Sequence, residues 1–293
     1  MSLKVSAQIA EKVKNGEISA AEAERFSNFV ETCNQELMTH SVITDNKFCE
    51  WFAKGEADRD TIRHFITQFS VFSNLFLVAQ TMKVINAGSL EGMRASKEIL
   101  ANELGVIFNN KGAATEEVTD KDREGDPAVV SIEGTVDGGT FRFKAAHFEW
   151  LLKLGSTVDL TFKDMGKRRN GTPATIFFCD QLMSIYGHED PNLAEGASFA
   201  VENWAAAGFW KQLIAGLEIF KEKEQPDLPL AFFTWHDRIE DQHAGHVMDE
   251  LEELYFEDDF DEEKFIAGGL DMLSGVEAFW VGLNEHRIAA AYV

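Results

Sequence analysis

Hydrophobic positions recur with helical spacing along most of the chain. Apolar residues three and four positions apart predict amphipathic helices, which lie within residues 18–40, 43–54, 58–87, 89–104, 147–155, 176–186, 194–222, 230–255 and 262–290. The segment from Asp58 to Thr61 supplies capping side chains for the third of these, and only five prolines interrupt the chain. Seven or more helices with so little strand pattern predict an all-α bundle.

Residues 109–146 follow a different pattern. A polar stretch is followed by VVSIEGTVDGGTFRFKA, in which apolar and polar residues alternate on both sides of Asp137-Gly138-Gly139. This arrangement is typical of a β-hairpin. A linker between two domains is the alternative, but the helical pattern resumes directly at His147. We therefore expect a single domain over residues 1–293, with an insertion at about 109–146.

Composition and charge narrow the classes of function. The 293 residues are 45% hydrophobic and 26% charged, as in a soluble globular enzyme. A net charge of −23 would repel nucleic acids and anionic membranes. Three cysteines without a CxxC pair fit a reducing compartment. With no signal-like N-terminus and no uncharged run near the roughly 18 residues of a membrane span, the sequence predicts a cytoplasmic protein.

One helical segment carries a stripe of metal-competent side chains. It reads FFTWHDRIEDQH, and at about 100° per residue Glu240 lies roughly 40° from His236, with His243 roughly 20° to the other side. The stripe borders an apolar face, where an unpaired carboxylate is costly. A solvent-exposed polar face is the simpler alternative. His246 lies about 80° away from His236, so we treat it as a neighbour and not as a ligand.

Three further residues could complete a site. Glu202 is a single carboxylate among Phe199, Trp204 and small apolar residues, Glu103 ends a predicted helix before Gly105, and His147 opens HFEWLLKLG. Each has an ordinary structural explanation when taken alone. Together with the stripe, they form a set of carboxylates and imidazoles of the kind that binds iron.

The four segments together resemble the haem-oxygenase-like diiron oxidases and oxygenases, the iron-containing redox enzymes. The shared features are His236-x3-Glu240-x2-His243 followed by Ala244, a helix end at Asn102-Glu103-Leu104-Gly105, a segment of the type HxxLWxxxLxxLG at His147, and a glutamate on the middle helix at Glu202. The resemblance covers residues 30 to 290. It departs from the family in that Glu240 replaces the commoner Asp.

The resemblance implies a haem-oxygenase-like helical fold and two non-haem iron ions that activate O2. The implied ligands are Glu103, His147, Glu202, His236, Glu240 and His243. The insertion lengthens the connection between Glu103 and His147. Some amine N-oxygenases of the family have an extra carboxylate in this connection, for which Glu133 and Asp137 are candidates. Ferritin-like diiron proteins need two Glu-x-x-His motifs, and only Glu240-x-x-His243 is present.

The leading hypothesis is therefore an iron-dependent oxidase or oxygenase acting on a small organic substrate. N-oxygenation of an amine and oxidative cleavage or desaturation of an aliphatic or amino acid both stay open. A metal-free thiaminase-like hydrolase, which needs a nucleophilic cysteine, and a non-catalytic binding protein are the alternatives. The resemblance also suggests a homodimer and an external electron donor. Phe199, Phe209, Phe232 and Phe233 could line an apolar cavity or simply pack the core.

Overall fold

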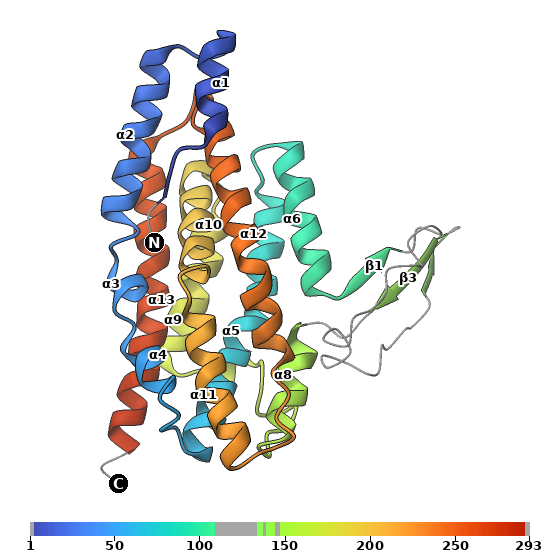
Figure 1. Cartoon of the computed structure of the whole chain (residues 1–293). Helices are drawn as coiled ribbons and strands as arrows, with labels where there is room; N and C mark the ends of the chain where they lie inside the picture. Colours follow the sequence, from blue (N-terminus) through green and yellow to red (C-terminus); the bar gives the residue numbers. More distant parts are fainter. Residues whose placement is uncertain (1–2, 109–133, 137–138, 144–146, 291–293) are drawn as a thin grey trace.

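The structure is a computed structural model. It describes residues 3–108, 134–136, 139–143 and 147–290. Within these ranges, the side chains of Glu91, 107–108, 134–136, 139–143, 239–247 and Asp249 are not described. Its helices form an elongated bundle (Figure 1). They are α1 Ala7–Asn15, α2 Ala20–Glu36, α3 Ser41–Thr44, α4 Lys47–Phe52, α5 Arg59–Ile85, α6 Leu90–Glu103, α8 His147–Ser156, α9 Pro173–Gln181, α10 Pro191–Ala205, α11 Phe209–Lys223, α12 Ala231–Leu254 and α13 Glu262–Ala290. The predicted all-α fold is confirmed.

Most helix starts agree with the sequence pattern. Asp58 accepts a hydrogen bond from the backbone N–H of Thr61 and caps α5, and Ser19 forms a capping box with Glu22 at the start of α2. The helix predicted over 194–222 is wrong as a single element. It divides into α10 and α11 because Gly208 adopts a left-handed conformation with φ of 96°.

Two long helices form the centre of the bundle. α5 and α13 are both largely apolar, and α13 packs along α10 and α9. α10 and α13 approach closely because Gly196 and Gly268 have no Cβ atom. A Cβ atom at Gly196 would collide with the backbone carbonyl of Phe265, and one at Gly268 would collide with that of Leu193. The close contact holds α10, the helix that carries Glu202, against α13.

Three short strands stand apart from the bundle. β1 Val106–Phe108 pairs antiparallel with β3 Gly139–Phe143, and β3 pairs antiparallel with β2 Gly134–Val136. Val136 faces Gly139 in the register, but residues 137–138 between them lie outside the described ranges, so the turn stays a prediction. β1 was not predicted from the sequence. β1 follows the end of α6 and pairs with β3 (Figure 1).

Among the described helices, two are long and apolar enough to cross a membrane by length and composition alone, namely α5 and α13. Half of the apolar window of each is buried inside the bundle. Core helices of soluble proteins have the same character, and the positions of α5 and α13 in the bundle fit that explanation.

Candidate metal centre

The predicted helix around His236 is present as α12, and the backbone orients the ring of this histidine. Nδ1 of His236 lies 2.6 Å from the carbonyl oxygen of Phe232, one turn earlier. A carbonyl oxygen only accepts hydrogen bonds, so Nδ1 is the donor, and a neutral imidazole then has its lone pair on Nε2. A backbone hydrogen bond to one ring nitrogen is the usual arrangement for a histidine that binds a metal through the other.

Glu103 and His147 meet across the insertion. Glu103 is the last residue of α6 and His147 the first of α8, and the two side chains are 15% and 7% exposed. Oε2 of Glu103 lies 2.8 Å from Nδ1 of His147, yet Nδ1 has no hydrogen bond among the described residues. A short approach without hydrogen-bond geometry is what two donor atoms directed at one shared ligand would give.

His147 also lies beside His236, so it contacts two other predicted ligands. The two imidazole centroids are 4.8 Å apart with a near-perpendicular arrangement. α8 packs against α12, and Figure 1 shows the two helices side by side in the lower half of the bundle. His147 therefore contacts both Glu103 and His236, and the three residues come from three different helices.

Aromatic rings surround the two histidines. Trp210 stacks on His236 with centroids 4.8 Å apart, Trp235 lies 4.6 Å from His147, and Phe232 contacts both rings. Trp150 contacts both His147 and Trp235. Such a shell excludes water and lowers the local dielectric, which strengthens every electrostatic interaction inside it.

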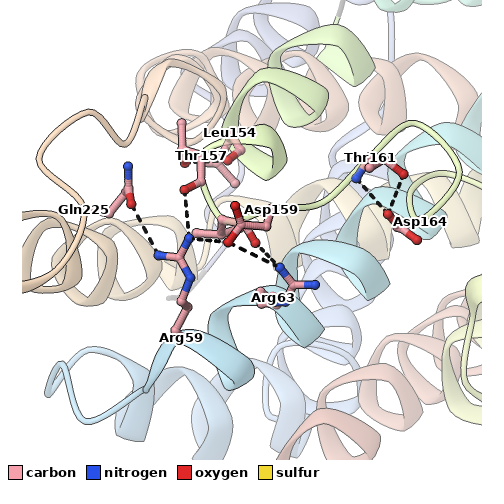
Figure 2. Close-up of polar contacts among 9 residues, drawn as sticks. Arg59, Arg63, Leu154, Thr157, Asp159, Thr161, Asp164 and Gln225 are labelled. Carbon is pink, nitrogen blue, oxygen red and sulfur yellow. Dashed lines mark hydrogen bonds and ion pairs between the residues drawn. The ribbon is translucent and has the colours of Figure 1, made fainter.

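A polar network anchors the loop that follows α8 (Figure 2). Arg59 at the start of α5 donates to Asp159, to the carbonyl of Thr157 and to Gln225, and Arg63 forms a second ion pair with Asp159 at 3.9 Å. Asp159 has a positive φ of 61°. The network ties the C-terminal end of α8 to α5, and so holds the helix on which His147 lies.

Glu202 lies in α10, which packs against α12. On the same face, one and two turns earlier, are Ser198 and Glu195, and both contact the buried Nζ of Lys83, at 2.6 and 3.3 Å. Tyr186 lies under Nζ, with its ring centroid 4.8 Å away. The charge of Glu202 is among the causes that raise the pKa of Tyr186, after burial, so this polar cluster adjoins Glu202.

The polar cluster of Gln80, Lys83, Tyr186 and Ser198 is internally satisfied. The Tyr186 hydroxyl donates to Gln80 at 2.7 Å, and Gln80 donates to the carbonyl of Ser96. Burial lowers the pKa of Lys83, but the carboxylates of Glu195 and Glu250, together with the phenol oxygen of Tyr186, outweigh it and raise the pKa overall. Lys83 is therefore a permanent cation. The cluster was not predicted from the sequence, because Lys83 near a helix end looks like an ordinary surface lysine.

The remaining predicted ligands are only partly described. The backbone of α12 includes Glu240 and His243, but their side chains lie outside the described residues, as does that of His246. Glu133 and Asp137 also lie outside them. Among the side chains that are described, no group of three or more His, Cys, Asp or Glu is close enough to hold a metal ion.

The four phenylalanines noted in the sequence are all buried, between 0% and 4% exposed. Phe232 contacts His147 and His236, whereas Phe199 packs on Phe265 in the core. Core packing therefore explains Phe199, and only Phe232 is part of the shell around the histidines. The tryptophans of that shell were not singled out in the sequence.

No protein-family model matches the chain, and no curated protein matches it either. Solved structures do match. A CADD-like protein of unknown function from Nostoc punctiforme superposes with a TM-score of 0.59 and 16% identity, over 91% of this chain and 97% of that one. A domain of unknown function with a heme oxygenase-like fold from Shewanella denitrificans gives a TM-score of 0.55 and 14% identity, over 94% and 97% of the two chains. The chain has a haem-oxygenase-like fold.

A third match to this fold is a TenA homologue from Pseudomonas syringae pv. tomato. It superposes with a TM-score of 0.58 and 9% identity, over 97% of this chain and all of that one. Identities this low show the haem-oxygenase-like fold alone, because one fold supports many unrelated activities. The function must therefore be argued from the side chains.

Proposed function

We propose that the chain is a non-haem diiron oxidase or oxygenase that oxidises a small organic substrate. Its proposed iron ligands are Glu103, His147, Glu202, His236, Glu240 and His243. The observation that carries the proposal is the 2.8 Å approach of Glu103 and His147, with Nδ1 of His147 otherwise without a hydrogen bond and the ring of His236 beside it. Buried polar atoms without partners are rare and call for an explanation.

The donor set fits iron. Imidazole nitrogens and carboxylate oxygens both suit iron in its ferrous and ferric states. When bound, two ferrous ions would supply electrons for the reduction of O2, and the reduced oxygen would be the oxidant of the substrate. His147 would bind through Nδ1 and His236 through Nε2, because the Phe232 carbonyl already occupies Nδ1 of His236.

The other residues of the site would orient the ligands and exclude water. Trp210 stacks on the His236 ring and fixes its plane, while Trp150 and Trp235 pack against His147. The Arg59–Asp159 contact at 2.7 Å holds the far end of α8. N-oxygenation of an amine and oxidative cleavage or desaturation of an aliphatic or amino acid are both compatible with this shell.

A metal-free thiaminase-like hydrolase on the same fold is the second candidate, and it needs a reactive thiolate. All three cysteines are buried. Burial raises the pKa of Cys33 and of Cys179 to about 12, and raises that of Cys49 well above its ordinary value. None would be a thiolate at neutral pH, which disfavours this candidate.

If the chain is instead a non-catalytic binding protein, we expect it to take up no iron.

Anaerobic loading with ferrous iron tests the proposal. We expect about two iron ions per chain by elemental analysis, and a transient absorbance change when O2 is admitted. The helix-face assignment on α12 is tested by a matched pair: His243→Ala should abolish iron loading with helical content retained, and His246→Ala should not. Absence of iron from the wild-type protein, or equal loss in both variants, would contradict the proposal.

A further inference from the structure

A row of aromatic rings leads away from His236. Its ring stacks on Trp210 with centroids 4.8 Å apart and planes at 22°. Trp210 in turn contacts Phe209 at 4.4 Å, and Phe209 stacks on Trp204 at 4.6 Å with planes only 7° apart. The row crosses the break between α10 and α11, so the kink at Gly208 brings Trp204 and Phe209 together.

The row ends at a surface pocket of about 130 Å³. Trp204 and Phe209 form part of its wall, together with Asn46, Glu50 and Gln212. Glu50 is exposed, so the pocket opens to solvent. Trp204 is only 3% exposed and Trp210 5%. A small molecule in the pocket would therefore touch the edge of Trp204 but could not reach the histidines.

The chemistry of the rings suits transfer of single electrons. Indole is among the most easily oxidised side chains, whereas the phenyl ring of Phe209 can serve only as a bridge. Nε1 of both Trp204 and Trp210 is buried without a hydrogen-bond partner in the described part of the chain. An indole that loses an electron there has no acceptor for its proton. It stays a strong oxidant and passes the charge on, which is one reason for leaving such a group unpaired.

We propose that Trp204 and Trp210, bridged by Phe209, carry single electrons from the surface pocket to the candidate metal centre. The inference rests on the proposed function, in which O2 is the oxidant. An electron leaves Trp204, passes to Trp210 and continues towards His236, and the indole of Trp204 becomes a radical cation. A one-electron donor of the enediol class in the pocket returns one electron and is oxidised by one electron. No atom is transferred, and both indoles return to their starting state.

Another tryptophan near the centre provides a control. Trp150 contacts His147 and Trp235, but no ring contact joins it to Trp204, Phe209 or Trp210 among the described residues. If oxidation simply spread to every indole near the centre, Trp150 would be modified and Trp204, near the surface pocket, would not. The aromatic row predicts that Trp204 is modified.

The test is oxidative modification in the absence of substrate. Iron-loaded protein is exposed to air, and oxygen added to each tryptophan is measured by peptide mass spectrometry. In the wild type, we expect at least about fivefold more oxidation of Trp204 than in metal-free protein, and its suppression by ascorbate. Trp210→Phe should return Trp204 to the metal-free level. Trp51→Phe should leave Trp204 oxidation unchanged, because the Trp51 ring contacts Phe48 and Phe52 and no ring of the row or of the proposed site among the described residues.

A second variant and an iron analysis separate the possible failures. Phe209→Leu breaks the bridge without removing a ring that contacts His236, so it gives the same loss even if Trp210→Phe disturbs iron binding. If the wild type takes up iron and consumes O2 but Trp204 is not oxidised, or is oxidised equally in Phe209→Leu, the electron path is wrong and the diiron proposal stands. If the wild type takes up no iron, both are wrong.

Discussion

Two groups of buried polar side chains adjoin the middle of this bundle, and they use their hydrogen bonds differently. In the cluster of Gln80, Lys83, Tyr186 and Ser198, each polar side chain has a partner. In the group of Glu103, His147 and His236, Nδ1 of His147 lies close to a carboxylate and yet has no hydrogen bond. A fully satisfied network stabilises a fold, whereas an unsatisfied buried imidazole nitrogen directed at a carboxylate is what a metal-binding pair would leave without its metal. We interpret the first group as structural and the second as functional.

Removing His147 should have the largest effect. In His147→Ala, we expect iron content to fall from two ions per chain to one or none, because a direct ligand is lost. The fall in affinity should exceed the roughly 10- to 100-fold that the loss of a supporting residue costs. Elemental analysis after anaerobic loading measures it. His286→Ala is the control, since that ring is exposed on α13. Full iron content in His147→Ala would show that the Glu103–His147 contact is only structural.

Removing the buried charge of Lys83 tests whether the cluster of Gln80, Lys83, Tyr186 and Ser198 is structural. Lys83→Met deprives Ser198 and Glu195 of their donor, and an unsatisfied buried group costs about 1–3 kcal/mol. Urea unfolding of metal-free protein measures the loss, with the exposed Lys97→Met on α6 as the control. Iron content should stay at two. A stable variant that fails to bind iron would place Lys83 in the functional group instead.

The contribution of Lys83 should also depend on pH in a defined direction. The pKa of Lys83 in the folded chain is raised above its ordinary value, despite burial, by Glu195, Tyr186 and Glu250. Its stabilising effect is therefore complete below the unfolded pKa of about 10.4, and is lost as pH rises through the folded pKa. The difference in unfolding free energy between wild type and Lys83→Met should be constant from pH 7 to 9 and shrink only at higher pH.

A smaller effect is expected from the phenol of the satisfied cluster. Tyr186→Phe removes the 2.7 Å hydrogen bond to Gln80 without changing the packing of the ring. The usual net value of such a bond is about 0.5–1.5 kcal/mol, measurable by urea unfolding. Phe76→Leu, which perturbs only the ring contact at 5.6 Å, separates packing from hydrogen bonding. Loss of iron in Tyr186→Phe would contradict the structural assignment of the cluster.

The helical spacing of apolar residues, together with capping residues and glycines, explains which parts of the fold could be predicted from the sequence. Helix ends were found where a cap or a glycine defines them, as at Asp58 and after Glu103. The break at Gly208 was missed because the apolar pattern continues through it from 194 to 222. A positive φ at one glycine is a tertiary property that local pattern does not reveal. β1 was missed because three residues are too few to establish an alternation.

The candidate site was also only partly predictable, because the pattern of one helix says nothing about its neighbours. Helical spacing places residues of one helix on one face, and so identifies the stripe beginning at His236. It gives no distance between helices, and the meeting of Glu103 with His147 follows from how α6 and α8 enter the bundle. The family resemblance supplied that pairing. Neither source indicated Lys83 or Trp210, whose roles depend on the elements that pack against them.

The smallest expected effect comes from a second histidine with an unpartnered buried atom. Nε2 of His64 has no hydrogen bond in the described structure, as with Nδ1 of His147. The neighbour of His64, however, is the ring of His286, stacked with centroids 3.5 Å apart, and not a carboxylate. Burial, with a contribution from His286, lowers the pKa of His64 to about 4. We therefore expect His64 to be a neutral structural residue and not a ligand.

His64→Gln should leave iron content unchanged and alter only the pH dependence of stability. Because the folded pKa of about 4 lies below the ordinary 6.5, the unfolded chain binds more protons in this range. The stabilisation due to neutral His64 is complete above pH 6.5 and is lost as pH falls towards 4. Unfolding free energies between pH 7 and 4 should fall less steeply in His64→Gln than in the wild type. If His64→Gln instead loses iron and its unfolding free energy has the same pH dependence as that of the wild type, the interpretation is wrong. An unpartnered imidazole would then be enough to indicate a metal site, without the carboxylate that lies beside His147.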